Sequence, residues 1–322
     1  MIQATPSLTA LATALMRALH TRADPKPIIF DPWGDRLVPE EARHAIESIA
    51  LAKMPALEGA TAGAVRASPM DAFLRASPAY TNVITRARFS EDALLASVSG
   101  GVRQYVLLGA GFDSFALRVP VEAQHLDIFE VDHPATQSLK KMRLAECGLS
   151  VSPRVHFVAA DLAVERLEEV LLNAGFGREI PAFFSWLGVT MYLTQAANLA
   201  ALSAIADCAS PGSELIFNYI DQAAFGGPKQ APSPDFVEVQ RVVAAMGEPF
   251  LSGFHPATLA ADLRALGLEL EEDVGEAALV QVYDPLNLNS LRPVAELHTA
   301  RARVLGSNRR SSIGPNPVRC SR

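Results

Sequence analysis

From Gln104 onward, short apolar runs alternate with amphipathic stretches of helical spacing, and this alternation constrains the fold more than any other feature. Such a pattern is typical of βα units around a parallel sheet. Five runs have the length and composition of buried strands: YVLLGAGF, LDIFEVD, VHFVAAD, AFFSWLG and SELIFNYI. The sequence therefore predicts a doubly wound α/β fold with a mostly parallel sheet.

The intervening and following segments predict helices and a hairpin at the end of the sheet. Helices are expected at 134–147, about 163–174, 194–209, 236–246 and 256–266. The turn-forming stretch DQAAFGGPKQAPSP indicates an insertion near 221–257. LELEEDV and AALVQVYD are interpreted as two closing strands that form a hairpin, which gives seven strands in all.

The first 100 residues have a different pattern, with helical spacing and no strand alternation. Leu8, Leu11, Leu15 and Leu19 recur every three or four residues behind a candidate helix cap, Ser7. We expect a helical N-terminal cover over 1–100, an α/β domain over 101–300 and a mobile tail over 301–322.

Composition excludes several classes of protein. With 49% hydrophobic and 20% charged residues, the chain is not intrinsically disordered. The net charge of −7 offers no general attraction to nucleic acid or to an anionic membrane. Three widely spaced cysteines favour a reducing compartment, and neither a signal peptide nor an apolar run of roughly 18 residues is evident. We expect a cytoplasmic protein.

The strongest local motif is the GAG turn, Gly109, Ala110 and Gly111, where a strand ends and a helix is expected to begin. Such a turn lets backbone N–H groups and the positive end of a helix approach a nucleotide-type ligand, although it can also be a tight turn without a ligand. Asp113 is either part of this site or a helix cap. Ser114 stands where a dinucleotide fingerprint has its third glycine, which favours a ligand without phosphates.

Acidic residues end the next two strands. Glu130 and Asp132 follow the GAG turn by about twenty residues, where a carboxylate accepts hydrogen bonds from ribose hydroxyls. One of the two is expected to bind and the other to support the helix that begins at Pro134. Asp161 and Leu162 follow the third strand and could receive an adenine ring, or Asp161 could cap a helix. These turns share the edge where open α/β sheets bind ligands.

Six ordered segments carry a family resemblance: MRALHTRADPKPIIFDPWGDRL, ITRARFSEDAL, VLLGAGFDSFALR, FEVDHP, FVAADL and WLGVTMYLT. Between about 14 and 283 the chain resembles the leucine carboxyl methyltransferase-like branch of the S-adenosylmethionine-dependent methyltransferases, which includes bacterial members of unassigned substrate. The resemblance implies a class I methyltransferase-like Rossmann fold, with a helical cover over a seven-stranded sheet. It also implies S-adenosyl-L-methionine as the methyl donor.

The resemblance also implies residue roles. Arg86 would pair with the methionine carboxylate, with Arg88 as its rival. Gly109, Ala110, Gly111 and Asp113 would form the turn beside the methyl donor, Asp132 would bind the ribose with Glu130 as second choice, and Asp161 and Leu162 would bind the adenine. One departure stands out: many relatives have a glutamate where this chain has Leu187, so the acceptor chemistry of carboxyl-methylating relatives does not transfer directly.

We expect O-methylation of a carboxylate or hydroxyl on a small molecule. A carboxylate needs no base, whereas a hydroxyl needs one, and His133 and Tyr192 are candidates. Tyr192 and Tyr219 could line the acceptor pocket, or could belong to the core. Trp33 and Tyr80 could close over the substrate.

Two other functions stay open, namely a nicotinamide-dependent oxidoreductase and a non-catalytic protein that binds an adenosyl ligand. Metal chemistry and serine hydrolysis are not expected, because the sequence has no HxxxH, HxH, CxxC or GxSxG motif. The sequence leaves the oligomeric state open.

Overall fold

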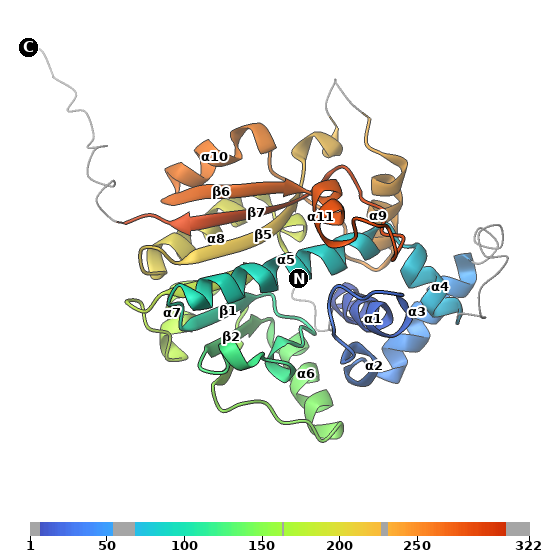
Figure 1. The fold of residues 1–322 in the computed structure, drawn as a ribbon, viewed down its shortest axis with the longest axis horizontal. Helices are drawn as coiled ribbons and strands as arrows, with labels where there is room; N and C mark the ends of the chain where they lie inside the picture. The colour runs from blue at the N-terminus through green and yellow to red at the C-terminus, as the bar shows by residue number, and fades with distance from the viewer. Residues whose placement is uncertain (1–6, 54–67, 163, 227–230, 307–322) are drawn as a thin grey trace, which may run out of the picture.

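The computed structural model describes residues 7–53, 68–162, 164–226 and 231–306 and is built on one seven-stranded sheet (Figure 1). The strands are β1 (Gln104–Leu108), β2 (Asp127–Asp132), β3 (Val155–Ala159), β4 (Ala182–Trp186), β5 (Glu214–Ile220), β6 (Leu268–Gly275) and β7 (Leu297–Val304). Their order is β3-β2-β1-β4-β5-β7-β6, with β1 to β5 parallel and β7 antiparallel to both neighbours. The predicted doubly wound, mostly parallel seven-stranded sheet is confirmed.

The central strands are apolar throughout because both faces of the sheet are covered. Successive side chains alternate between the two faces. Val106 and Phe184 pack with residues of helices α7 (Leu167–Asn173), α8 (Gln195–Cys208) and α10 (Pro256–Ala265). Tyr105 and Phe183 pack with residues of helix α5 (Ala79–Ser99). Every residue of β1, β4 and β5 is buried, which explains why these three strands read as continuous hydrophobic runs.

Helices precede the sheet and separate most of its strands. They are α1 (Leu8–Ala23), α2 (Gly34–Leu37), α3 (Glu40–Lys53), α4 (Pro69–Ala76), α5 (Ala79–Ser99), α6 (Pro134–Glu146), α7 (Leu167–Asn173), α8 (Gln195–Cys208), α9 (Pro234–Ala245), α10 (Pro256–Ala265) and α11 (Glu276–Tyr283). As predicted, Ser7 caps α1 by accepting from the Ala10 N–H, and Pro134 opens α6. Figure 1 shows α1 to α4 grouped beside one end of the sheet.

The N-terminal helices share a hydrophobic core with the sheet domain. Leu15, Leu19 and Ile84 lie in one buried cluster with Phe112, which follows β1, and with Val242 of α9. This shared packing holds α1 and α9 in the same buried cluster as the segment that follows β1.

Two predictions about the end of the chain are wrong. AALVQVYD is helix α11 rather than a strand, with Leu279 buried and Val282 exposed. The seventh strand is β7, which includes residues 301–304 of the predicted tail; residues 307–322 lie outside the described part of the chain. β6 and β7 pair antiparallel, but α11 and a loop connect them instead of a hairpin turn.

Candidate functional site

A cavity of about 820 Å³ runs along the carboxyl edge of the parallel strands. It is lined by the segments that follow β1, β2, β3 and β4, by α1 and α5, and by α9 with the loop 246–251 after it. Its size and position are those of a small-molecule site in an open α/β sheet. Arg86, Gly109, Ala110, Gly111, Asp113, Asp132, Asp161 and Tyr192 all line this cavity.

The GAG turn brings bare backbone to the cavity. Gly109 and Gly111 have φ values of +68° and +51°, a region that side chains disfavour. A Cβ atom at Gly109 would overlap Val189 Cγ2, and one at Gly111 would lie 3.1 Å from Ala10 Cβ. Glycine is therefore required at both positions by conformation and by space.

The expectation that an α-helix begins directly after this turn is wrong. Only a 3₁₀ turn, Phe115–Leu117, follows, and Asp113 Oδ1 accepts from the Phe115 N–H at 2.7 Å. No helix of useful length therefore points its positive end at the cavity from this turn. Asp113 combines both predicted roles, since it caps the turn and lines the cavity.

Asp132 is tied to the GAG turn from the neighbouring strand. Its Oδ2 accepts from the Gly111 N–H and its Oδ1 accepts from the His133 N–H at 2.6 Å. Burial raises the pKa of Asp132, and the two backbone N–H groups oppose that rise. The carboxylate thus holds β2 and the turn together at the cavity wall.

Glu130 does not belong to this site, so its selection as a candidate binding residue is wrong. Its side chain is 1% exposed and pairs with Lys140 of α6 at 2.5 Å, away from the cavity lining. Burial raises the pKa of Glu130, and the Lys140 ammonium opposes that shift. Glu130 therefore supports α6, the second of the two roles considered for this pair.

At the end of β3 the structure places Asp161 at the cavity, as expected, but not Leu162. Asp161 lines the cavity, and its N–H donates to Glu165 Oε1 at 2.8 Å. Leu162 is 40% exposed and does not line the cavity, so its predicted contact with the adenine ring is wrong. Val164 is the apolar residue that reaches the cavity from this segment.

The structure separates the two candidate arginines of α5. Arg86 lines the cavity and donates from Nη1 to Asn82 Oδ1 at 2.9 Å, and burial lowers its pKa to about 10. Arg88 instead donates to Asp92 at 3.0 Å and to the Ile28 carbonyl at 3.0 Å, outside the cavity lining. Arg86 is therefore the arginine at the site.

Only one of the two predicted pocket tyrosines reaches the cavity. Tyr192 lines it, and burial raises the pKa of this tyrosine to about 12. Tyr219 is fully buried in the core, where its hydroxyl donates to Asp273 Oδ2 at 2.7 Å and its ring stacks on His298. The prediction that Tyr219 lines the pocket is wrong, because its side chain is enclosed in the core beside His298, its cross-strand partner on β7.

The cavity is closed by other residues than those expected. Neither Trp33 nor Tyr80 lines it, and the Tyr80 hydroxyl donates to Asp24 Oδ2 at 3.1 Å. Instead, Glu248 accepts from the hydroxyls of Ser7, at 3.2 Å, and Thr9, which joins the start of α1 to the loop after α9. These two segments cover the cavity.

The apolar wall of the cavity was not predicted from the sequence. Val239, Val242 and Val243 of α9 line it together with Met246. Their spacing of three and four residues is the signal of a helix with one apolar face. In the structure that face packs on the core through Val242 and lines the cavity as well.

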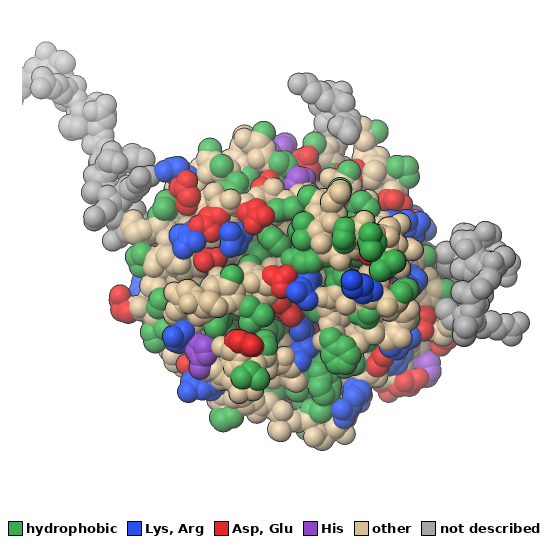
Figure 2. All heavy atoms as spheres, in the orientation of Figure 1, with side chains coloured by type: hydrophobic (Ala, Val, Ile, Leu, Met, Phe, Trp, Pro, Cys, Tyr) green, Lys and Arg blue, Asp and Glu red, His purple; other side chains and the backbone are tan. Residues whose placement is uncertain are grey.

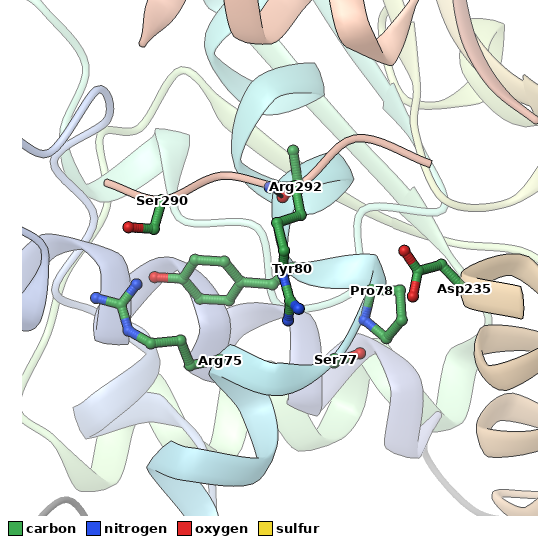
Figure 3. Close-up of a pocket in the computed structure, with 8 residues that line it drawn as sticks. Arg75, Ser77, Pro78, Tyr80, Asp235, Ser290 and Arg292 are labelled. Atoms are coloured by element: carbon green, nitrogen blue, oxygen red, sulfur yellow. Dashed lines mark hydrogen bonds between the residues drawn. The ribbon is translucent and has the colours of Figure 1, made fainter. Parts of the chain in front are cut away.

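A second, much smaller hollow lies where the end of α4, the start of α5 and the start of α9 meet (Figure 3). Arg75, Tyr80 and Asp235 are among its lining residues, and its volume is about 20 Å³. That volume holds about one water molecule, so this hollow is not a substrate site.

The described ranges contain no group of three or more His, Cys, Asp or Glu side chains suited to a metal ion. Among the helices they include, none is both long and apolar enough to span a bilayer. On the face shown in Figure 2, acidic and basic side chains are intermixed rather than segregated into a basic patch.

Comparisons with known proteins give consistent results. The sequence model of the family described as "Leucine carboxyl methyltransferase" matches residues 10–206. YktD of Bacillus subtilis (strain 168), provisionally named an S-adenosyl-L-methionine-dependent methyltransferase, is 31% identical over 302 residues, covering 92% of this chain and 97% of YktD.

Two solved structures share the fold at low sequence identity. A provisionally named methyltransferase from Thermobifida fusca YX has a TM-score of 0.55 at 16% identity, with 94% of this chain and 97% of that chain covered. A DUF574 family protein from Streptomyces avermitilis MA-4680 has a TM-score of 0.52 at 16% identity, with 80% and 95% covered. At this level of identity the similarity establishes the arrangement of the sheet and its helices.

Proposed function

The chain belongs to the leucine carboxyl methyltransferase family, and on this basis we propose that it methylates an oxygen atom, a carboxylate or a hydroxyl, of a small molecule. Its activity is methyl transfer, and its methyl donor is S-adenosylmethionine. The observation that carries the proposal is the meeting of Arg86, Gly111, Asp132 and Asp161 in one cavity.

The residues present fit this methyl donor. The bare turn at Gly109 and Gly111 leaves space that side chains would fill. Among the described residues, no carboxylate pairs with Arg86, so its guanidinium can accept a carboxylate from a ligand. Asp132 and Asp161 supply hydrogen-bond acceptors at the ends of β2 and β3, where ribose hydroxyls and an adenine amino group need them.

The chain's task is to bind and align, because a sulfonium-bound methyl group is already activated and the departing thioether is neutral. Arg86 fixes the amino-acid end of the methyl donor from α5, and Asp132 fixes the ribose from β2. The contact of Glu248 with Ser7 and Thr9 covers the reacting groups and limits water. Alignment of two reactants contributes about 7–11 kcal/mol in favourable cases.

The acceptor is proposed to lie between α1, α9 and the segment after β4. Val239, Val242 and Met246 offer an apolar surface there, and Tyr192 offers a hydroxyl. Because its pKa is raised to about 12, Tyr192 stays protonated at neutral pH and donates a hydrogen bond rather than acting as a base. His133 Nδ1 accepts from the Ala135 N–H and so caps α6.

The oxidoreductase alternative has less support from the site. Ser114, which replaces the third glycine of a dinucleotide fingerprint, is 1% exposed and accepts from Arg118 Nε at 2.9 Å. The absence of an α-helix directly after the GAG turn removes the dipole that a pyrophosphate would use. A protein that binds the methyl donor without catalysis remains the competing function.

Binding and turnover measurements together test the proposal. Isothermal titration calorimetry should detect binding of S-adenosylmethionine and S-adenosylhomocysteine, and no binding of NAD(H) at the same concentrations. Mass spectrometry should then detect S-adenosylhomocysteine together with a product heavier by one methylene when a panel of carboxylic acids, phenols and alcohols is supplied. Binding of NAD(H) alone would support the oxidoreductase, and binding of the methyl donor without turnover on any acceptor would support the non-catalytic protein.

A further inference from the structure

The cavity extends beyond the residues assigned to the methyl donor, into a region between α1, the segment after β4 and α9 with the loop 246–251, which we call the acceptor side. Val239, Val242 and Val243 line it from α9, and Phe250 and Leu251 line it from the loop. A molecule that fills this region therefore buries an apolar body against aliphatic and aromatic side chains.

Glu248 is the charged residue of this loop, and it shares a wall of the acceptor side with Tyr192. The loop is fixed to the segment after β4, because the Leu251 N–H donates to the Met191 carbonyl at 2.7 Å. The rings of Phe250 and Tyr192 pack on each other with their centroids 5.5 Å apart. Burial and, after it, the negative charge of Glu248 raise the pKa of Tyr192 to about 12. The carboxylate and the phenol therefore act on the same part of the cavity.

The end of α9 determines where Glu248 lies. Gly247 has a φ of +84°, and its N–H donates to the Ala244 carbonyl at 3.0 Å. The Glu248 N–H donates to the Val243 carbonyl at 3.0 Å. These two bonds are those of a Schellman motif, in which a glycine with positive φ ends the helix. The backbone of Glu248 is thus fixed by the local sequence.

The carboxylate of Glu248 is held through one of its two oxygens. Oε2 accepts from the Ser7 hydroxyl at 3.2 Å and from the Thr9 hydroxyl, both at the start of α1. Within the described parts of the chain, no residue donates a hydrogen bond to Oε1. Because Glu248 lines the cavity, Oε1 is available to accept a hydrogen bond from a bound molecule.

The cationic side chains at the cavity are committed elsewhere. In the described ranges they are Arg17, Arg86 and His133. Arg17 is 8% exposed and donates to Asp31 at 2.7 Å and to the Phe112 carbonyl at 2.9 Å. Arg86 is assigned to the carboxylate of the methyl donor, and His133 caps α6. The part of the acceptor side that the structure describes therefore offers no free cation to an anionic acceptor.

A carboxylate and a hydroxyl meet different conditions beside Glu248. A carboxylate brings a second negative charge that no cation compensates, which a partly buried site disfavours. A hydroxyl can donate to Oε1 in a charge-assisted hydrogen bond. A hydroxyl acceptor also needs a base, and Tyr192, which stays protonated, does not supply one. The arrangement therefore favours a neutral acceptor that carries a hydroxyl group.

We propose that the acceptor is an apolar alcohol or phenol and that Glu248 is its general base. This inference rests on the proposed function and narrows it from a carboxylate or a hydroxyl to a hydroxyl. Glu248 Oε1 takes the hydroxyl proton while the acceptor oxygen bonds to the methyl carbon. The electron pair of the broken carbon–sulfur bond stays on sulfur, and the proton then leaves Glu248 for solvent.

Matched probes test the class of acceptor by calorimetry on protein saturated with S-adenosylhomocysteine. The pairs are 4-butylphenol with 4-butylbenzoic acid, and 1-octanol with octanoic acid. The wild type should bind the hydroxyl member of at least one pair about tenfold more tightly than the acid. Glu248→Gln keeps an oxygen for Ser7 and Thr9 but removes the charge, so it should lose most of this preference.

Two further variants separate the charge of Glu248 from its structural contact. Thr9→Val removes the hydroxyl that donates to Glu248 and leaves the charge, so it should weaken both members of a pair equally and keep the preference for the hydroxyl. Glu238→Gln is the matched control, because Glu238 lies on α9 outside the cavity lining and forms an exposed pair with Arg241. It should change neither affinity nor preference.

Turnover of the preferred hydroxyl probe tests the role of Glu248 as a base. Glu248→Gln should lower kcat about 10²- to 10⁴-fold and change KM far less. Glu248→Ala should be similarly slow, and added acetate should restore part of its activity because a free carboxylate can take the proton. A contact that only holds the loop in place would not give this rescue.

The outcomes distinguish this inference from the proposed function. Preference for the acids, binding of none of the four probes, or equal kcat in wild type and Glu248→Gln would overturn the inference. Methylation of the acids instead of the hydroxyl compounds would do so while leaving the proposed O-methylation intact. Failure of the wild type to bind S-adenosylhomocysteine would remove the proposed function itself.

Discussion

The Asp132→Asn substitution tests the ribose site while retaining the shape of the side chain. Asp132 holds the Gly111 N–H through Oδ2 and the His133 N–H through Oδ1. Asparagine keeps one acceptor oxygen and places an NH₂ group where the second acceptor was. One buried backbone N–H then loses its partner, which costs about 1–3 kcal/mol of unfolding free energy.

The effect on binding is calculated separately from the effect on stability. A hydrogen bond between a hydroxyl and a charged carboxylate contributes about 1.5–3 kcal/mol. Its loss corresponds to a roughly 10- to 150-fold higher Kd, since each 1.4 kcal/mol is a factor of ten. Asp132→Asn should therefore bind S-adenosylhomocysteine about 10- to 150-fold more weakly than the wild type.

Calorimetry with S-adenosylhomocysteine and with its 2′-deoxy analogue measures this loss. Because the analogue lacks one of the hydroxyls in question, the variant should discriminate less between the two ligands than the wild type does. Thermal unfolding provides the control for folding, and a decrease in Tm of a few degrees is expected. A folded variant with wild-type affinity for S-adenosylhomocysteine would refute the assignment of Asp132 to the ribose.

Three further predictions concern the turn, the acceptor side and pH. Gly111 has a φ of +51°, and a Cβ atom added there would lie 3.1 Å from Ala10 Cβ, so Gly111→Ala should destabilise the fold by about 1–2 kcal/mol and weaken S-adenosylhomocysteine binding. The control Gly148→Ala, also at positive φ but in open space, should affect stability alone. Chemical denaturation measures the stability of both variants, and calorimetry measures their binding. Tyr192→Phe should retain binding of the methyl donor within about twofold and lower turnover of an identified acceptor. The pH optimum of turnover should stay the same, because Tyr192 does not act as a base. A shifted pH optimum would contradict the hydrogen-bond role. Burial raises the pKa of Glu276 in the folded protein to about 8, so the free energy of unfolding should decrease as pH rises from about 4.5 to about 8. Urea titrations of Glu276→Gln should lack this pH-dependent decrease. Identical pH dependence of the unfolding free energy in wild type and Glu276→Gln would contradict the prediction.

Much of the fold could be predicted because buried parallel strands leave a strong pattern. β1, β4 and β5 are covered on both faces, so their sequences are uninterrupted apolar runs. β7 leaves no such pattern, because Arg301 and Arg303 interrupt it and gave it the appearance of a tail. In the structure Arg301 lies near Glu214, at 3.7 Å, and Arg303 pairs with Glu271, and both partners are on adjacent strands. Such pairing cannot be inferred before strand order is known.

The site shows the same division between local and long-range information. Gly109, Gly111, Asp132 and Asp161 were found because each lies directly after a strand that could be recognised. The choice between Glu130 and Asp132 depends on Lys140, because its ammonium group forms an ion pair with Glu130. The sequence gives no means of placing that lysine in advance.

The cover of the cavity was missed for a related reason. Glu248 and Thr9 are 239 positions apart in the chain, so their contact depends on how α1 and α9 pack on the same sheet. The family, the fold and the methyl donor expected from the resemblance are confirmed. Cytoplasmic location and the absence of nucleic acid and membrane partners stay predictions.

The position of β7 between β5 and β6 has a consequence for biosynthesis. Since β7 is made after both of its neighbours, β5 and β6 emerge from the ribosome with bare edges that nothing made earlier can pair. The nascent chain therefore has two unpaired strand edges, which are prone to aggregation, until residues 297–304 leave the ribosomal exit tunnel. Chains truncated just before residue 297, or ribosomes stalled there, should give polypeptides that aggregate or bind chaperones. These polypeptides already contain every residue that lines the cavity except Leu297.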